Sequence, residues 1–487
     1  MKSGIRKIVA SYSVVLSLVM LVISSSSFAG AKIDTSLVGD WTGTIEFSGA
    51  KLKIVFHVVK TDSGTLSATM DSPDQSAYGI RASSVQVKED SAFIGVSSIG
   101  GAYEGRFSAT KDTIDGKWKQ GGVTIKLVVL KSAAPLPVVT MKRPQEPKPP
   151  FPYKSEDVSF KSEITGMTYT GTITEPDSGG QFPAAILITG SGAHDRDETI
   201  FGHKPFMVIA DFLTRRGIAV LRVDDRGIGG STGNKMTVTT TAHTADAIAE
   251  IGYLKGRNEI DSKKIGVIGH SEGGVIAPMV ASESKDVAFV VLLAGTGMPG
   301  SDIILAQTKL IEETEGVDSA FLARQLEDTR RTFEIAKSDK DSAGAAADLR
   351  SYFESTIGEW GAEIKKNGGK PEESIDDKIR SLLNPWFRYF LTYDPRPALE
   401  KVTCPLLAMG GTLDLQVPAE DNLREIESAL KKGGNKDYTI KLLPGLNHLF
   451  QDAKTGSPKE YSQIEETFSP QALKIMGDWI VERSRNR

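Results

Sequence analysis

The sequence predicts two folded parts: a small antiparallel β-barrel or sandwich domain, and after it a larger α/β domain whose mainly parallel sheet is covered by helices. Three observations lead to this prediction. Short alternating strands fill residues 34–131, a proline-dense linker follows at residues 132–153, and strands alternate with helical segments over residues 154–487. A chain of 487 residues is also too long for one ordinary domain.

Residues 1–29 have the pattern of a secretory signal peptide. Three basic residues precede an apolar stretch from Val14 to Ile23, and Ser27-Phe28-Ala29 has the small-x-small form of a cleavage site, so we expect cleavage near Ala29. An uncleaved membrane anchor is the alternative, although the apolar stretch falls short of the roughly 20 residues that span a bilayer. We therefore expect a periplasmic or secreted bacterial protein without a stable membrane anchor.

Composition narrows the classes of function. The chain has 58 basic and 62 acidic residues, and nothing in that balance suggests a nucleic-acid surface. Cys404 is the only cysteine, which excludes an intrachain disulfide and a lipid-modified N-terminal cysteine. Export without disulfides is compatible with a large core, and we expect Cys404 to be a small buried apolar residue.

The region from about Asp40 to Leu130 predicts about eight short strands. Apolar residues alternate along residues 52–58, and the other runs are Trp41–Phe47, Thr65–Met70, Arg81–Val87, Ala92–Ser97, Tyr103–Ala109, Thr113–Trp118 and Val123–Leu130. Trp41, Tyr103 and Trp118 could line a ligand-binding mouth, but we favour a role in the core. His57 alternates with apolar neighbours and is expected to be structural.

The segment at residues 132–153 favours extended polyproline conformation and predicts a semi-rigid spacer. After it the sequence predicts the strands Val158–Glu163, Thr168–Thr174, Ala184–Ile188, Ile218–Val223, Ile265–Ile268, Val287–Leu293, Pro405–Gly411 and Tyr438–Leu443, and the helices Phe206–Arg215, Thr244–Lys255 and Val275–Ala281. Helix-like segments at about residues 301–393 interrupt this alternation. We expect them to form a cap over the active site.

The strand that contains Ile265, Val267 and Ile268 breaks into Gly269-x-Ser271-x-Gly273 before a helix. This order is typical of a nucleophile elbow, in which a serine occupies a strained strand-to-helix turn and its neighbours must be small. The pattern alone also matches many glycine-rich turns. The flanking strand and helix favour the interpretation of Ser271 as a nucleophile.

A serine nucleophile needs a base and an orienting acid, and after an elbow serine these follow in the order acid, then histidine. Of the six histidines only His448 follows Ser271 in the chain, so His448 is the candidate base. The alternative is that His448 is a solvent-facing loop histidine without a catalytic role. Asp414 lies just past the C-terminal end of a predicted buried strand, where the acid is required. Asp421 is the less favoured candidate, because its pattern predicts an exposed helix.

The oxyanion hole is predicted from two backbone amides. The amide of Glu272 lies at the N-terminus of the helix after the elbow, and the glycine-rich loop at residues 189–197 offers Ser191, with Gly192 as the alternative donor. Another glycine cluster, residues 224–231, lacks the spacing of a dinucleotide-binding loop. We interpret it as a tight loop held by an Asp/Arg pair.

Four motifs occur together in residues 155–487: His270-Ser271-Glu272-Gly273-Gly274, Asp224-Asp225-Arg226-Gly227-x-Gly229, Gly411-x-x-Asp414-x-x-Val417-Pro418 and Asn447-His448. In combination they resemble bacterial α/β-hydrolase esterases related to serine aminopeptidase-like and dienelactone hydrolase-like proteins. The resemblance implies the α/β-hydrolase fold and carboxylic ester hydrolysis, with Ser271, Asp414 and His448 as the catalytic triad. The loop at residues 189–197 departs from the His-Gly-Gly-Gly form of many lipases.

The sequence therefore predicts a serine carboxylesterase that acts on small-molecule esters with short to medium acyl chains. The mechanism requires no metal or organic cofactor. Activity should rise as the pH increases through about 6 to 7, because His448 must be neutral to act as the base. The aromatic stretch Pro385–Phe390 either lines an acyl pocket or packs the cap onto the core. The sequence leaves the natural substrate and the oligomeric state open.

Two alternatives remain. The first is a serine peptidase with the same triad, in which Asp195, Asp197 and Glu198 hold the amine of the substrate. The second is a binding protein in which the β-rich domain captures a lipid or glycan and the hydrolase fold is inert.

Overall fold

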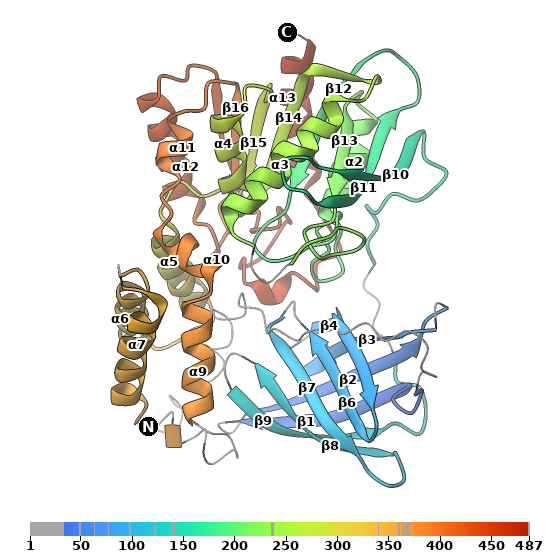
Figure 1. Cartoon of the computed structure of the whole chain (residues 1–487), viewed down its shortest axis with the longest axis vertical. Coiled ribbons are helices and arrows are strands. Elements are labelled where there is room, and N and C mark those ends of the chain that lie inside the picture. Colours follow the sequence, from blue (N-terminus) through green and yellow to red (C-terminus); the bar gives the residue numbers. More distant parts are fainter. Residues whose placement is uncertain are drawn as a thin grey trace. The chain divides into compact units, whose positions relative to one another are not determined.

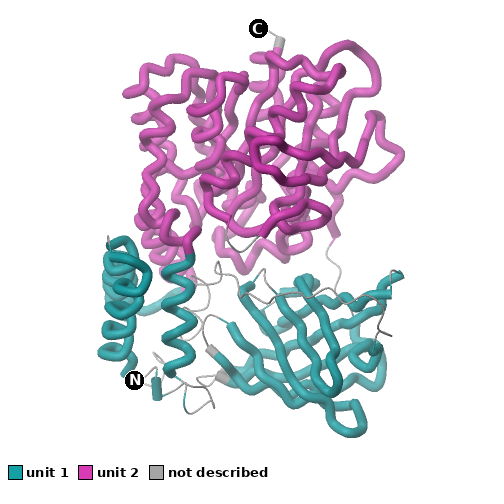
Figure 2. Tube along the Cα trace, in the orientation of Figure 1, with its two compact units in different colours: residues 1–141, 316–384 teal, residues 142–315, 385–487 magenta. Residues whose placement is uncertain are grey.

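The structure is a computed structural model, and it describes residues 34–485 apart from 48–49, 63, 76, 97–98, 121–122, 138–141, 235–237, 339, 359–360, 363–364 and 366–370. The expected signal peptide lies outside the described residues. The chain divides into two compact units (Figure 2), one with residues 1–141 and 316–384 and the other with residues 142–315 and 385–487.

In the first unit the described strands form one antiparallel sheet in the order β4-β3-β2-β1-β9-β8-β7-β6-β5. The strands are β1 Gly39–Phe47, β2 Ala50–Lys60, β3 Leu66–Ser72, β4 Ala77–Arg81, β5 Ser84–Lys88, β6 Ser91–Val96, β7 Gly101–Phe107, β8 Thr113–Gln120 and β9 Val123–Lys131, with a short 3-10 helix η1 at Pro73–Gln75. The sheet is strongly curled (Figure 1), and its inner face is filled by a hydrophobic core. The barrel alternative of the prediction therefore describes this sheet.

The run Arg81–Val87, expected as one strand, is divided between β4 and β5. The amide of Ala82 donates to the carbonyl of Ala68 in β3, and the amide of Ser83 donates to the carbonyl of Gly95 in β6. The chain thus changes partner between two consecutive residues. The alternating sequence does not reveal this change, because the side-chain period of 2 continues through it.

Three aromatic side chains that could have lined a ligand-binding mouth belong to the core of this sheet. Trp41 and Tyr103 are fully buried and Trp118 is 2% exposed. The Trp41 indole donates to the carbonyl of Leu37 at 2.7 Å, and the Tyr103 hydroxyl donates to the carbonyl of Ile114 at 3.0 Å. Their polar atoms are therefore satisfied inside the domain, as buried tyrosine and tryptophan require.

In the second unit the described strands form a sheet in the order β10-β11-β13-β12-β14-β15-β16-β17. The strands are β10 Tyr153–Lys161, β11 Thr168–Pro176, β12 Phe182–Ile188, β13 Ala219–Val223, β14 Ile260–His270, β15 Phe289–Leu293, β16 Leu406–Gly411 and β17 Tyr438–Leu443. The first three positions pair antiparallel, and all later neighbours pair parallel. The C-terminal ends of the parallel strands consequently meet at one edge.

Helices cover both faces of this sheet (Figure 1). Helices α3 Thr240–Lys255, α4 Gly273–Glu283 and α12 Ala419–Lys432 bury their apolar sides on one face, and α2 Pro205–Thr214 and α13 Pro470–Arg485 on the other. Along β12, Ala184 and Ile186 face the first layer while Ala185 and Leu187 face the second. Because helices cover both faces and exclude water, the central strands are continuous apolar runs rather than alternating ones.

The segment expected to form a cap consists of helices joined by turns in the part of it that the structure describes. It contains α5 Gly300–Thr314, α6 Ser319–Ala336, α7 Ser342–Thr356, α9 Pro371–Leu382 and α10 Pro385–Thr392, and the short helix α11 Arg396–Leu399 follows. The side chains of Asp318 and Asp341 cap the N-termini of α6 and α7. Helices α6, α7 and α9 belong to the first unit, whereas α5 and α10 belong to the second.

The second half of the proline-dense segment is attached to the second unit. The Arg143 guanidinium donates to the carbonyls of Phe201, Ser462 and Ile464 at 2.9 to 3.1 Å, and Gln145 Oε1 accepts the amides of two residues near the start of α13. Cys404 is only partly buried, against the core. No helix within the described part of the chain combines the length and apolarity that crossing a bilayer requires.

Candidate active site

Ser271 occupies the turn between β14 and α4, as the sequence predicts. Its φ is 54°, in the left-handed region that a non-glycine residue rarely adopts. A Cβ on Gly269 would lie 2.0 Å from the carbonyl oxygen of Gly273, and one on Gly273 would lie 2.2 Å from that of Ile188. Both flanking positions therefore require glycine, and the amide of Ser271 is fixed by donating to Leu293 of β15 at 2.9 Å.

Asp414 and His448 meet at the C-terminal ends of β16 and β17. His448 Nδ1 lies 2.9 Å from Asp414 Oδ2, and both side chains are almost fully buried. Asp414 Oδ1 accepts the amides of Gln416 and Val417 at 2.9 and 2.8 Å. These bonds hold the carboxylate at the orientation that fixes the tautomer of the imidazole. Asp421 is exposed on α12 and bonds to Arg424, away from His448.

His270, the neighbour of Ser271 in the chain, contacts His448. The ring of His270 lies 5.0 Å from the ring of His448 between centroids, and His270 Nε2 lies 3.0 Å from the His448 carbonyl oxygen. No hydrogen bond among the described residues joins Ser271 Oγ to His448. Such catalytic hydrogen bonds often tighten only when substrate binds.

The loop after β12 lies against the nucleophile. A Cβ on Gly190 would lie 3.2 Å from Ser271 Cβ, and the amide of Gly190 donates to Glu198 Oε1 at 2.7 Å. That bond occupies the Gly190 amide, which leaves Ser191 and Gly192 as the loop's candidate oxyanion donors. The amide of Glu272 has no hydrogen-bond acceptor in the described part of the chain, as a donor in an oxyanion hole requires.

The side chain of Glu272 has a role that the sequence did not indicate. Its Oε1 accepts the hydroxyl of Thr240 at 2.6 Å and the indole N–H of Trp386 at 2.8 Å. Trp386 stacks on Phe390 with centroids 5.6 Å apart, and Phe390 is buried. The residue after the nucleophile therefore ties the aromatic helix α10 to the elbow.

The three acidic residues that could have held a substrate amine are engaged within the protein. Asp197 forms an ion pair with Arg222, and Asp195 Oδ1 accepts the amides of Asp197 and Thr199. Glu198 Oε1 accepts the amide of Gly190 and contacts His270 Nδ1 at 2.9 Å. These contacts favour a structural function for the acidic loop.

The loop after β13 is held by two Asp/Arg pairs, each with a partner outside it. Asp224 pairs with Arg196 at 2.7 Å, and Arg226 pairs with Asp246 of α3 at 2.5 Å. Between them, Asp225 accepts the Thr189 hydroxyl at 3.1 Å and the His194 amide at 2.7 Å. Asp225 therefore braces the loop that carries the candidate oxyanion donors.

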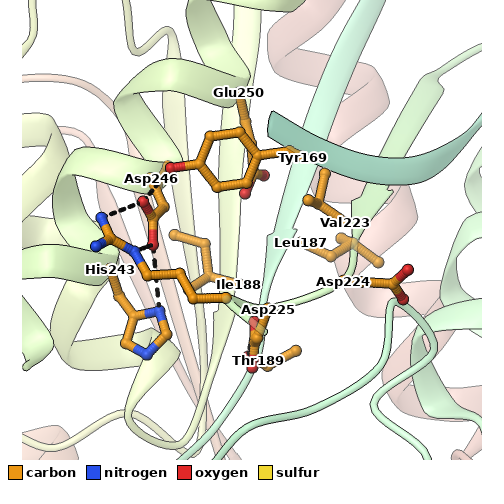
Figure 3. A pocket seen from close by; sticks show the side chains of 12 residues that line it. Tyr169, Leu187, Ile188, Thr189, Val223, Asp224, Asp225, His243, Asp246 and Glu250 are labelled. Atoms are coloured by element: carbon orange, nitrogen blue, oxygen red, sulfur yellow. Dashed lines mark hydrogen bonds and ion pairs between the residues drawn. The ribbon is translucent and has the colours of Figure 1, made fainter. Parts of the chain in front are cut away.

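A cavity of about 20 Å³ lies next to Asp225 (Figure 3). Asp225, Asp246 and Glu250 line it, together with Tyr169 and other side chains, whereas Ser271, Asp414 and His448 do not. Burial, with the charges of Asp246 and Asp225, raises the pKa of Glu250 well above its ordinary value, and burial also raises the pKa of Asp225. The cavity has room for one water molecule, so it is not a substrate pocket.

The sequence is similar to those of several known proteins. Esterase EstD of Thermotoga maritima is 28% identical over 306 residues, which cover 62% of this chain and 63% of that protein. An uncharacterised protein of Mycobacterium tuberculosis is 28% identical over 165 residues, 34% of this chain and 51% of that protein. The chain thus spans less than two thirds of the length of both relatives.

Among solved structures, an esterase of Pyrococcus furiosus is 15% identical and superimposes with a TM-score of 0.42, covering 72% of this chain and 99% of that one. The characteristic sequence pattern of the alpha/beta hydrolase family matches residues 185–463. That range is more than half of the chain, and it includes β12, the elbow, Asp414 and His448. With its strand–turn–helix at Ser271 and its buried Asp414–His448 pair, the chain belongs to the alpha/beta hydrolase family.

Proposed function

We propose that the protein is a serine carboxylesterase in which Ser271, Asp414 and His448 form the catalytic triad. The observation that carries the proposal is the 2.9 Å contact between Asp414 and His448, at the same edge of the sheet as the strained Ser271. A carboxylate held by two backbone amides on one side and an imidazole on the other is the arrangement that prepares a neutral base. The likeness to EstD supports an esterase rather than another hydrolase of this family.

In the proposed reaction His448 Nε2 takes the proton of the Ser271 hydroxyl while Oγ forms a bond to the ester carbonyl carbon. The negative charge that develops on the carbonyl oxygen is stabilised by the amide of Glu272 and that of Ser191 or Gly192. The protonated His448 then donates to the departing alkoxide, and an acyl group remains on Ser271. Water, deprotonated by the same imidazole, hydrolyses this acyl-enzyme and restores the serine.

Substrate size and location are part of the proposal. We infer short to medium acyl chains on small-molecule esters, with the aromatic helix α10 close to the acyl group because Trp386 bonds to the residue after the nucleophile. A periplasmic or secreted bacterial location is supported by the composition of residues 1–29.

A peptidase with the same triad has less support. Its expected amine-binding residues, Asp195, Asp197 and Glu198, are bonded to the protein's own backbone and side chains. A protonated amine would have to displace these partners. The geometry therefore favours a substrate without a free amine.

The test compares a short-chain nitrophenyl ester with a matched aminoacyl anilide, using wild-type protein, Ser271→Ala and the control Ser282→Ala. Ser282 lies near the other end of α4, where its hydroxyl only bonds to a carbonyl of its own helix. Loss of ester turnover in Ser271→Ala alone is the expected result. Faster cleavage of the anilide would favour the peptidase, and full activity of Ser271→Ala would refute the proposal.

A further inference from the structure

His270, the residue before the nucleophile, links two loops of the site. Its ring is 7% exposed, with Nδ1 2.9 Å from Glu198 Oε1 and Nε2 3.0 Å from the carbonyl oxygen of His448. The same Oε1 atom accepts the amide of Gly190 at 2.7 Å. One chain of hydrogen bonds therefore runs from the candidate oxyanion loop through His270 to the backbone of the candidate base.

The acceptors in this chain determine where the protons are. A backbone carbonyl oxygen only accepts, so His270 Nε2 carries a hydrogen. If Glu198 is ionised it likewise only accepts, and Nδ1 then carries a hydrogen too, whereas a protonated Glu198 would donate to a bare Nδ1. In the ionised arrangement both nitrogens are protonated, and His270 is an imidazolium ion that forms a buried ion pair with Glu198.

Other charges around the ring agree with this assignment. Burial alone would lower the pKa of His270, but the charge of Glu198, the hydrogen bonds to Glu198 and to the His448 carbonyl, and the charge of Asp414 together raise it above its ordinary value. The contact of His448 Nδ1 with Asp414 leaves Nε2 of that ring, and not Nδ1, as the atom that can accept the serine proton.

Glu198 is held in an unfavourable state. Its φ is 50°, in the left-handed region, and its side chain is 2% exposed, with Oε2 lacking a hydrogen-bond partner among the described residues. A strained backbone and an unpaired buried carboxylate oxygen both reduce the stability of a fold. Such features cluster at functional sites, where the surroundings enforce them.

We propose that Glu198 and His270 are positioning residues, whose ion pair fixes the oxyanion loop relative to the backbone of His448. The inference rests on the proposed function, since it assigns the pair to the same reaction. Loss of the pair would let the Ser191 and Gly192 amides and the His448 imidazole move apart. These groups act mainly on the transition state, so the loss should appear in kcat more than in KM.

The decisive variant is Glu198→Gln. Glutamine can still accept the Gly190 amide, but it carries no charge to hold an imidazolium. Above the ordinary histidine pKa of about 6.5, His270 would be neutral and could donate to only one of its two acceptors. At pH 6 we expect the kcat of Glu198→Gln to be near that of the wild type. At pH 8 it should be about 10- to 100-fold below the wild-type kcat at the same pH, with KM changed by less than about 3-fold.

Two variants separate the two hydrogen bonds. His270→Gln can reach the His448 carbonyl but not Glu198, and His270→Asn can reach Glu198 but not the carbonyl. Because neither side chain titrates, both should lower kcat without the alkaline fall that Glu198→Gln shows. The control Asp197→Asn removes a neighbouring, partly buried carboxylate that pairs with Arg222, and it should lower the melting temperature without changing the pH profile.

A measurement independent of turnover is the NMR titration of the histidine Cε1 resonances in 13C-labelled protein, with the His270 signal assigned from its absence in His270→Gln. The wild-type His270 should remain protonated at pH 7.5, and Glu198→Gln should lower its midpoint by more than one pH unit. A neutral His270 in the wild type, or a pH profile of Glu198→Gln parallel to the wild type, would overturn the inference. Activity retained by Ser271→Ala would instead overturn the proposed function.

Discussion

Two buried histidines, His57 in the first unit and His270 in the second, each contact two polar groups. The two histidines differ in how far along the chain these partners lie. His57 in β2 lies 2.8 Å from Asp40 of β1 and 3.1 Å from Asp71 of β3. These partners are only 17 and 14 residues away and belong to neighbouring strands. The partners of His270 are 72 and 178 residues away, in two loops.

The difference reflects the two sheets. In an antiparallel meander the register places near neighbours of the sequence side by side, as with Asp40 opposite His57. In a parallel sheet the loops after successive strands converge at one edge, although long stretches of chain separate them. A polar bridge in the first sheet therefore secures local strand pairing, and a bridge in the second secures the relative positions of loops that carry a site.

The largest expected effect concerns another histidine contact of the second unit, that between Asp414 and His448. Asp414→Asn should lower kcat for a nitrophenyl ester by about 10³- to 10⁴-fold, because the asparagine N–H would donate to Nδ1 and leave the hydrogen on Nε2. The melting temperature should change little. A variant that keeps more than a tenth of wild-type kcat would contradict the role of Asp414.

His57→Leu should have the opposite effect: it should lower the stability of the fold and leave kcat unchanged. It leaves the partly buried carboxyl group of Asp40 and the buried one of Asp71 without the imidazole, and a buried polar group that loses its hydrogen-bond partner costs about 1 to 3 kcal/mol. We expect that loss in urea unfolding followed by tryptophan fluorescence, with unchanged kcat. The control Glu46→Ala breaks an exposed ion pair with Lys51 on the same sheet and should have little effect. A reduced kcat at unchanged stability would contradict the structural role of His57 and so the contrast with His270.

Glu250 offers a contrast to these bridged groups, because it is a buried carboxyl group whose Oε2 has no hydrogen-bond partner among the described residues. Its pKa in the folded protein is raised far above 4.5, so the folded state binds more protons than the unfolded state between these values. The contribution of Glu250 to stability is thus complete below pH 4.5 and is lost as the pH rises through the raised pKa.

Glu250→Gln should consequently be more stable than the wild type at pH 8, and the gain should shrink towards pH 5, where the folded wild type keeps its carboxyl group protonated. Thermal unfolding at both pH values measures it. Glu259→Gln, at an exposed position nearby in the sequence, is the control. A gain that does not depend on pH would show that Glu250 is not protonated in the folded protein.

The smallest expected effect is that of Trp386→Phe. It removes the indole N–H that donates to Glu272 and retains an aromatic ring against Phe390. A hydrogen bond contributes about 1 kcal/mol, and this one holds α10 against the elbow. KM for medium-chain esters should therefore rise about 3- to 10-fold, with kcat within about 2-fold. An equal effect on acetate and octanoate esters would argue against a position near the acyl chain.

The sequence was most informative where chemistry constrains order and spacing. The elbow required two glycines around Ser271, chain order singled out His448, and strand ends pointed to Asp414; the structure brings Asp414 and His448 into contact. The catalytic roles of these residues stay predictions. Strand and helix bounds in the second unit agree with the expected ones within two residues, because long apolar runs between glycine-rich loops leave few alternatives, except that β10, β14 and α3 begin four or five residues earlier than expected.

What the sequence did not reveal depends on tertiary contacts. Nothing in the pattern around Glu198 or His270 indicates a buried pair 72 residues apart, and the interaction of Glu272 with Trp386 spans 114 residues. The change of partner at Ala82 was missed because the period of alternation does not change there. Periodicity reports which face a side chain occupies, but it does not identify the neighbouring strand.

That change of partner has a consequence for the behaviour of the β-rich sheet in a crowded compartment. Unpaired strand edges are templates for pairing with another chain, and long ones promote aggregation. Here the two terminal strands of the sheet, β4 and β5, are only five residues each, and they come from one continuous segment that turns from β3 to β6. A partner or a second copy would therefore find little backbone to extend, and recognition of this sheet would have to use its side chains.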